Sequence, residues 1–292
     1  MSRFGRVSTA MVTPFDAKGN IDFHKTTQLV EYLIENGTDS LVVAGTTGES
    51  PTLSSEEKLA LFSHVVKIAD GRVQVIAGTG SNNTYASVEL TKKAEEVGVD
   101  AILLVTPYYN KPNQEGLFQH FKTIAEATNL PVMLYNVPGR TAANIQPKTV
   151  IKLSEIPNIV AIKDASGNLD SMAEIIANTS EDFELYSGDD GLTLPVLSIG
   201  GKGVISVASH IIGNEIQEMI ESFFSGSYEA AAKQHQKLLP LMRGLFDAPS
   251  PVPVKTALQL KGFNVGSVRL PLVPLTEQER SNLIDLLNNW KR

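Results

Sequence analysis

Short apolar runs alternate with longer amphipathic segments along the first two thirds of the chain. Eight of these runs, rich in Val, Ile and Leu, predict strands at residues 6–12, 40–45, 73–78, 101–106, 131–136, 158–163, 183–188 and 203–208. Runs that are apolar throughout are typical of strands in a parallel sheet that is covered on both faces. We therefore predict parallel strands connected by helices.

The segments between the strands carry helical signals of their own. Residues 22–37 place Leu29 and Leu33 on one face at helical spacing. A second helix is expected to begin at Ser54, because Glu57 follows three residues later in a capping-box pattern. Strands and helices that alternate in this way indicate the α/β class.

Eight strand–helix units without an intervening linker predict a (β/α)8 barrel, and a doubly wound open sheet is the alternative. The number of strands favours the barrel. Beyond the last strand only helical patterns remain, at residues 214–224, 227–245, 251–261 and 276–290. We expect one structural unit, with the barrel and its catalytic site in residues 1–213 and a barrel-completing C-terminal helical segment in residues 214–292.

Polar and glycine-rich segments follow most of the predicted strands. They read "GTTGES" (45–50), "GTGSNN" (78–83), "TPYYNKP" (106–112), "YNVPGRT" (135–141) and "SGDD" (187–190). The active site of a (β/α)8 barrel lies at the carboxyl ends of its strands. These segments are therefore where we expect the functional residues.

Lys163 ends the apolar sixth strand and shares a face with Ile159 and Ala161, so it should point into the mouth of the barrel. Burial disfavours an ammonium group, and a neutral amine can attack a carbonyl and form an imine. Tyr135 ends the preceding strand and should lie beside Lys163, where a phenol can transfer protons. Taken alone, the lysine could snorkel to solvent or pair with Asp164, and the tyrosine could be a core residue with its hydroxyl bound to the backbone.

Two adjacent threonines, Thr46 and Thr47, follow the second strand. Their hydroxyls suit a bound substrate, and the capping of a turn is an equally ordinary role for them. The glycines Gly45 and Gly48 would let a carboxylate approach the backbone amides. Neither this segment nor "GGKG" (200–203) matches a phosphate-binding loop pattern.

Composition narrows the functional classes. The 292 residues carry a net charge of −7, which argues against a nucleic-acid or membrane-surface binder. Without cysteine there is no disulfide or thiolate nucleophile. The chain has no apolar run long enough to span a membrane and no apolar N-terminal targeting region, so we expect a cytoplasmic enzyme.

Metal chemistry is not indicated by the sequence. The histidines are scattered, at positions 24, 64, 120, 210 and 235, and form no metal-binding pattern. Asp189 and Asp190 could bind a cation, but a turn or a helix cap is the simpler interpretation. An aldol reaction at this site would therefore proceed through an imine, with no metal or cofactor.

The segments "GTTGES", "YYNKP", "YNVPGRT" and "AIKDASG" (161–167) resemble the signature segments of the pyruvate-dependent class I aldolase family, and the resemblance extends over essentially the whole chain. Members with this combination are (β/α)8 barrels that condense pyruvate with L-aspartate-4-semialdehyde to give 4-hydroxy-tetrahydrodipicolinate. The reaction is the first committed step towards diaminopimelate and lysine. The resemblance implies a lyase with these two substrates.

The same resemblance implies catalytic roles. Lys163 matches the Schiff-base lysine and Tyr135 matches the general acid and base. Thr46 matches a relay between two tyrosines, and Thr47 matches the residue that holds the pyruvate carboxylate. Tyr109 matches a relay tyrosine that a neighbouring subunit contributes, which implies a homo-oligomer, at least a dimer and often a dimer of dimers in this family.

Three further positions are implied as substrate-binding. Arg140 matches an arginine that meets the carboxylate of the aldehyde substrate, consistent with the bidentate pairing that arginine offers. Ile205 matches a position whose backbone contacts pyruvate, and Gly188 matches a glycine that lines the pocket. The related N-acetylneuraminate lyase shares the lysine and the tyrosine but lacks the "VPGRT" context, and sugar-acid aldolases of the family often lack this arginine pattern too. A non-catalytic keto-acid sensor on the same barrel is disfavoured because Lys163 and Tyr135 are both present.

Feedback inhibition by L-lysine is expected to be weak or absent. Strongly inhibited family members carry two histidines and a glutamate in a pocket at the dimer interface, at positions that here hold Ser55, Lys58 and Ala86. Ala86 offers no carboxylate to an ammonium group, and Lys58 places a like charge nearby. Asn82 and Tyr108 of that pocket remain.

Overall fold

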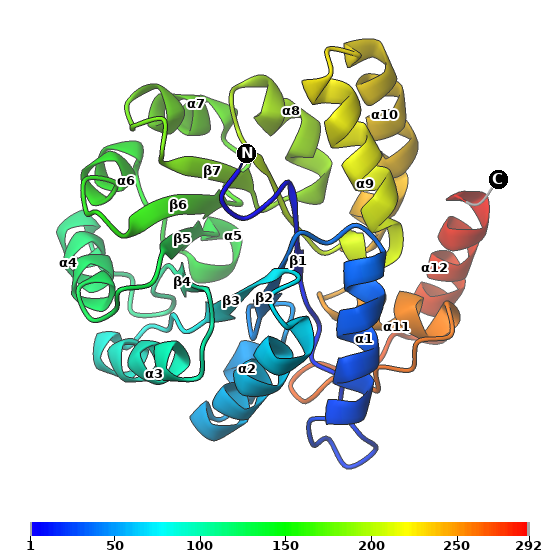
Figure 1. The fold of residues 1–292 in the computed structure, drawn as a ribbon. Coiled ribbons are helices and arrows are strands. Elements are labelled where there is room, and N and C mark those ends of the chain that lie inside the picture. The colour runs from blue at the N-terminus through cyan, green and yellow to red at the C-terminus, as the bar shows by residue number, and fades with distance from the viewer. Residues whose placement is uncertain (1, 291–292) are drawn as a thin grey trace.

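The computed structural model describes residues 2–290 as a closed parallel barrel surrounded by helices (Figure 1). Each strand pairs with the next, and β8 pairs with β1, so the sheet has no free edge. The strands are β1 Val7–Ala10, β2 Ser40–Val43, β3 Gln74–Gly78, β4 Ala101–Val105, β5 Val132–Asn136, β6 Ile159–Asp164, β7 Glu184–Ser187 and β8 Gly203–Ser206. The predicted barrel is confirmed, and the open-sheet alternative is wrong.

All eight predicted strands are present, each within two residues of its expected ends. The predicted run 40–45 is longer than β2 because Ala44 takes a positive φ of 52°, which directs the chain out of the sheet. The strands are buried almost throughout, as apolar runs in a covered parallel sheet should be.

The helices between the strands cover the outside of the barrel, except the short α5, which lies at the carboxyl-end opening (Figure 1). They are α1 Phe23–Glu35, α2 Ser55–Ala69, α3 Thr84–Glu96, α4 Gln114–Ala125, α5 Pro138–Thr141, α6 Pro147–Leu153, α7 Leu169–Ala177 and α8 Thr193–Ser198. The capping box of α2 is confirmed, because Ser54 Oγ accepts from Glu57 N at 3.2 Å and Glu57 Oε2 accepts from Ser54 N at 2.9 Å. On α1, Leu29 and Leu33 are buried as predicted.

Four helices form the C-terminal segment: α9 Ser209–Phe224, α10 Tyr228–Gly244, α11 Val252–Leu260 and α12 Glu277–Trp290. All four were predicted, but the first begins at Ser209 rather than at residue 214. The expected boundary between residues 213 and 214 therefore falls inside α9, next to the non-helical Ile212. Helix α9 packs against β1 and α10 packs against α9. Within residues 2–290, no helix combines the length and the apolar character needed to cross a membrane.

The amino ends of the strands are fixed by carboxylates that precede the neighbouring strands. Asp39 Oδ2, just before β2, accepts from the backbone N–H of Val7 at 2.9 Å. Asp100 Oδ2, just before β4, accepts from the backbone N–H of Val75 at 2.7 Å. These bonds satisfy donors at strand starts, where the sheet itself offers no acceptor.

Candidate active site

Two adjoining cavities open at the carboxyl ends of the strands. The larger has a volume of about 560 Å³ and the smaller about 280 Å³. Thr46, Tyr135, Val137 and Arg140 line both. The larger cavity is also lined by Lys163, so most of the residues expected at the site lie around one space.

Lys163 and Tyr135 lie side by side because β5 and β6 are neighbours in register. Their Cα atoms pair directly, and both side chains are almost fully buried, with 6% and 5% of their surface exposed. Lys163 Nζ lies 4.2 Å from the centre of the Tyr135 ring. The amine therefore sits next to a phenol in the larger cavity, as the alternation of side chains along β6 predicted.

The competing interpretations of this pair find no support in the described part of the chain. The carboxylate of Asp164 accepts from Asn136 Nδ2 at 3.1 Å and from Ser166 N at 2.8 Å, and no ion pair joins it to Lys163. No hydrogen bond within residues 2–290 uses the hydroxyl of Tyr135. Amine and phenol are both left available to a bound molecule.

The loop after β2 presents Thr46 and Thr47 to the larger cavity. Within residues 2–290 the loop is closed by backbone bonds, from Glu49 N to Thr46 O at 3.1 Å and from Ser50 N to Gly45 O at 3.2 Å, and neither threonine hydroxyl caps it. The capping interpretation of these hydroxyls is therefore unsupported.

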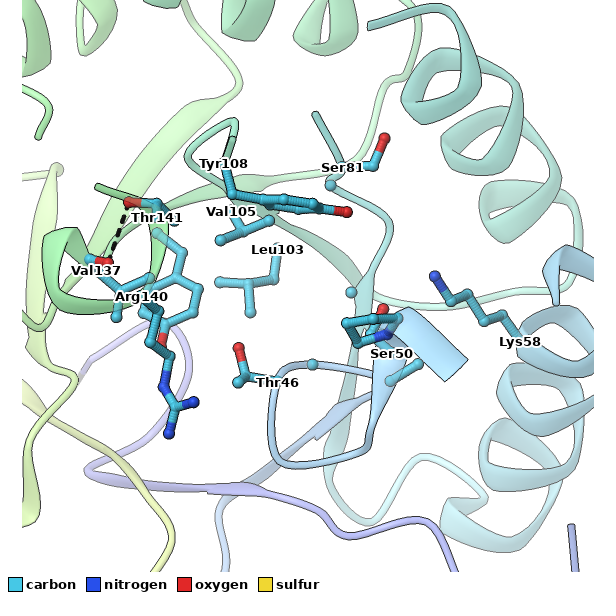
Figure 2. Close-up of a pocket in the computed structure, with 16 residues that line it drawn as sticks. Thr46, Ser50, Lys58, Ser81, Leu103, Val105, Tyr108, Val137, Arg140 and Thr141 are labelled. Atoms are coloured by element: carbon cyan, nitrogen blue, oxygen red, sulfur yellow. Dashed lines mark hydrogen bonds between the residues drawn. The ribbon is translucent and has the colours of Figure 1, made fainter. Parts of the chain in front are cut away.

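Arg140 stands at the rim, on the single turn α5 that follows β5. Pro138 begins this turn, and the Thr141 hydroxyl donates to Val137 O at 3.1 Å (dashed in Figure 2). The guanidinium is exposed and lies on the same side of the smaller cavity as Thr46, whereas Lys58 lies on the opposite side (Figure 2). An exposed cation at the mouth suits an incoming anionic substrate.

The loops after β7 and β8 complete the larger cavity. Gly188 lines it, and a Cβ at this position would lie 2.8 Å from the Cβ of Ala165, which explains the glycine. Ile205 is 1% exposed and does not line either cavity, whereas Val207, two residues further on, does. Sequence reasoning placed pyruvate contacts at Ile205 and did not single out Val207.

The aspartate pair after β7 has the structural role that the sequence suggested. Asp189 accepts from Gly191 N at 2.8 Å and begins a short 3₁₀ helix. Asp190 is fully buried and accepts from the backbone N–H groups of Val207 and Ala208, both at 3.0 Å, and from the Ser206 hydroxyl. Burial raises the pKa of Asp190. No group of acidic residues and histidines among residues 2–290 is arranged to hold a metal ion.

Tyr109 lies outside both cavities of its own chain. It is 89% exposed, and its φ of 73° directs the loop after β4 outwards. Its neighbour Tyr108 lines the smaller cavity together with Ser81 and Lys58. Burial lowers the pKa of Lys58, and none of the ion pairs in the described residues includes it.

The C-terminal segment contributes a wall that sequence reasoning missed. Met242, Arg243, Phe246 and Ser250, which lie at the end of α10 and beyond it, line the larger cavity. Of these residues only Met242 and Arg243 lie within the helix, and the helical pattern does not show which surface its end covers.

Comparison with known proteins assigns the chain to a family. The sequence model of the dihydrodipicolinate synthetase family matches residues 3–290. The 4-hydroxy-tetrahydrodipicolinate synthase of Bacillus subtilis (strain 168) is 68% identical over 281 residues, which cover 96% of this chain and 97% of that protein. The Bacillus velezensis enzyme of the same name is 66% identical over 284 residues, or 97% and 98% of the two chains.

Solved structures agree with this assignment. Dihydrodipicolinate synthase from Bacillus anthracis has a TM-score of 0.97 at 65% identity, covering 99% of each chain. The enzyme from Cyanidioschyzon merolae, solved with lysine bound, has a TM-score of 0.98 at 49% identity, covering 100% of this chain and 99% of that one. The chain belongs to the dihydrodipicolinate synthetase family.

Proposed function

We propose that this protein is a lyase that condenses pyruvate with L-aspartate-4-semialdehyde through a Schiff base on Lys163, giving 4-hydroxy-tetrahydrodipicolinate for lysine and diaminopimelate biosynthesis. The observation that carries the proposal is the buried amine of Lys163 beside Tyr135 in a cavity of about 560 Å³. The family assignment and the names of the relatives support it.

The reaction begins when the neutral amine of Lys163 attacks the keto carbon of pyruvate. The carbonyl oxygen leaves as water, and the resulting imine makes the methyl protons acidic. Tyr135, with Thr46 and a neighbour's Tyr109 as its proton relay, transfers the protons in these steps. Loss of a methyl proton gives an enamine, whose carbon attacks the aldehyde of the second substrate. Attack by that substrate's amino group on the imine then closes the ring and releases Lys163.

Two anion contacts orient the substrates. Thr47 and the glycine-flanked backbone of its loop bind the pyruvate carboxylate, and Gly188 and Val207 line the same cavity. Val207 lies just beyond the strand of Ile205, whose backbone was expected to contact pyruvate. Arg140 at the rim binds the carboxylate of the semialdehyde. Positioning of both substrates lowers the entropic part of the barrier before any bond forms.

Trapping the imine tests this function. Incubation with pyruvate and borohydride should add one reduced pyruvyl group to the peptide that contains Lys163, as measured by mass spectrometry. The Lys163→Met variant should stay unmodified, whereas Lys58→Met, which removes the lysine of the neighbouring cavity, should be modified like the wild type. Modification elsewhere, or none in the wild type, would rule out the mechanism. An imine without turnover of the semialdehyde would support a keto-acid sensor instead.

The active unit is a homo-oligomer, at least a dimer and in keeping with the family a tetramer. The exposed side chain of Tyr109, directed away from its own cavities, supports a role in a neighbour's site. Co-expression of Tyr109→Phe with Lys163→Ala should restore activity in mixed dimers, because one of the two sites then has both residues. Inactive mixed dimers of verified composition would argue for self-contained sites.

The barrel and the C-terminal segment form one unit, and the enzyme works in the cytoplasm.

L-Lysine inhibits this enzyme weakly or not at all. Lys58, which forms no ion pair within residues 2–290, lines the smaller cavity, and Ala86, at the start of α3, offers no carboxylate. Loss of a few kcal/mol of pairing weakens binding by roughly tens- to thousands-fold, at about 1.4 kcal/mol per factor of ten. Turnover at saturating pyruvate should be unchanged up to millimolar L-lysine. Clear submillimolar inhibition would contradict this proposal.

A further inference from the structure

The loop that carries Thr46 and Thr47 is held in a conformation that needs external support. Ala44 and Glu49, at its two ends, both take positive φ values, of 52° and 58°. Residues other than glycine adopt this region at a cost in free energy, so surrounding contacts must impose it. The contacts on Glu49 identify where that support comes from.

Glu49 is tied to the C-terminal segment by a buried ion pair. Its Oε1 accepts from Lys255 Nζ at 2.6 Å, and its Oε2 accepts from the backbone N–H of Arg269 at 2.8 Å. The side chains of Glu49 and Lys255 are 1% and 2% exposed. Lys255 Nζ also donates to Ser267 O at 2.8 Å, so the ammonium is bound on two sides.

Arg269 extends the same network to α2 and to the segment after β1. Its guanidinium donates to both carboxylate oxygens of Glu57, at 2.9 and 2.5 Å, and to Thr52 O at 2.7 Å. Phe15 lies against both cations, with Lys255 Nζ 4.2 Å and Arg269 Cζ 4.4 Å from its ring centre.

None of these charged residues lines either cavity, so the network acts on substrate indirectly, and its direct bonds to Glu49 make the loop the nearest route. We propose that Glu49, Lys255 and Arg269 are positioning residues, which fix the Thr46–Thr47 loop from the C-terminal segment and thereby set the affinity of the site for pyruvate. This inference rests on the proposed function, in which that loop binds the pyruvate carboxylate.

A charge-neutral double variant tests the proposal. Glu49→Gln with Lys255→Met removes both buried charges together, which avoids leaving one of them unpaired. The KM for pyruvate should rise about tenfold, because a loosened loop no longer presents its hydroxyls and amides at fixed positions, and the KM for the semialdehyde should change less than twofold. The exposed pair Glu229 and Lys233 on α10 gives the matched control: Glu229→Gln with Lys233→Met should leave both constants unchanged.

A second variant decides the question if the double variant does not fold. Glu49→Asp keeps the charge pair but shortens the side chain by one methylene, which shifts the loop towards Lys255 or lengthens the bond. It should raise the pyruvate KM in the same selective way. A folded variant of either kind with an unchanged pyruvate KM, or with equal changes for both substrates, would overturn the proposal. The borohydride test separates this proposal from the proposed function. If wild-type Lys163 is trapped with pyruvate but the loop variants bind pyruvate normally, only the positioning role is wrong. If wild-type Lys163 is not trapped, the proposed function and the positioning role both fail.

Discussion

The two ends of the barrel use polar side chains in opposite ways. At the amino ends, side-chain carboxylates bind neighbouring groups: Asp39 accepts from Val7 N, and Glu184 accepts from the Tyr186 hydroxyl at 2.6 Å. At the carboxyl ends, the amine of Lys163 and the hydroxyls of Tyr135 and Thr47 face a cavity without protein partners among residues 2–290. Satisfied groups stabilise the fold, and unsatisfied ones are free for chemistry.

The largest expected effect at the carboxyl end comes from Tyr135→Phe. This change removes one hydroxyl that has no protein partner in the described residues, so the melting temperature should stay within a few degrees of wild type. Turnover should fall by about 10²–10⁴, the usual contribution of a positioned acid or base. Steady-state kinetics together with thermal unfolding measure both quantities. Near-normal kcat would mean that Tyr135 is structural and that the contrast between the two ends is wrong at this position.

The opposite outcome is expected at the amino end for Asp39→Ala. Asp39 Oδ2 accepts from Arg6 N at 2.7 Å, from Val7 N at 2.9 Å and from Gln217 Nε2 at 2.8 Å. Losing these bonds should lower the free energy of unfolding by about 2–4 kcal/mol, while kcat of the folded enzyme stays near wild type. Denaturant unfolding and kinetics at low temperature test this. A folded variant with strongly reduced kcat would show that the two ends are not separable.

Arg140→Ala should have a smaller and substrate-specific effect. The guanidinium is exposed at the rim, and it is proposed to meet a carboxylate that only the semialdehyde presents there. The KM for the semialdehyde should rise about tenfold, or about 1.4 kcal/mol, with little change for pyruvate. Arg243→Ala, which removes the other arginine that lines the larger cavity, is the matched variant. Equal increases for both substrates would contradict the assignment of Arg140.

The smallest expected effect concerns His210. It lies near the carboxyl ends of the strands, but both of its ring nitrogens are hydrogen-bonded, unlike the amine of Lys163 and the hydroxyl of Tyr135. Its Nε2 accepts from Val12 N at 3.1 Å and its Nδ1 donates to Val207 O at 2.8 Å, so the folded state holds it neutral. Burial lowers the pKa of His210 to about 4, and the pKa of the buried His120 likewise to about 4.

The sign of the resulting pH dependence follows from the unfolded chain, in which both histidines bind protons near pH 6.5. Stability is therefore fully present above pH 6.5 and is lost as the pH falls from there towards 4. Between pH 7 and 5.5 the loss should be about 1 kcal/mol per histidine. His210→Gln and His120→Gln should each flatten the slope of unfolding free energy against pH. If the variants keep the wild-type slope of unfolding free energy against pH, groups other than these two histidines cause the pH dependence.

The proximity of Lys163 and Tyr135, the proposed catalytic pair, could be predicted from sequence because everything that places them is local. Strands that follow each other in the chain are neighbours in this barrel, and the alternation along β6 fixes the direction of Lys163. The pairing of Tyr135 with Lys163 in the register of β5 and β6 confirms that argument. The roles of these residues remain proposals.

What the sequence did not reveal depends on contacts between distant segments. Arg243 and Phe246 reach the larger cavity because α10 ends above it, and no local pattern encodes that position. The partner of Glu49 is Lys255, 206 residues further along the chain. In the sequence, Glu49 is one acidic residue in the loop segment "GTTGES", and Lys255 is one lysine at the end of "PVPVK" (251–255). Nothing in either segment indicates that the two side chains pair.

Closure of the sheet also constrains how the protein is made on the ribosome. Strand β1 has both of its neighbours only when β8, which ends at Ser206, has been synthesised. Until then an emerging chain exposes two open strand edges, which are sites for association with other nascent chains. The anchor of the Thr46–Thr47 loop arrives later still, with Lys255 and Arg269. At translation speeds of about 5–20 residues per second, the last strand of the barrel is thus synthesised seconds before the residues that anchor the Thr46–Thr47 loop.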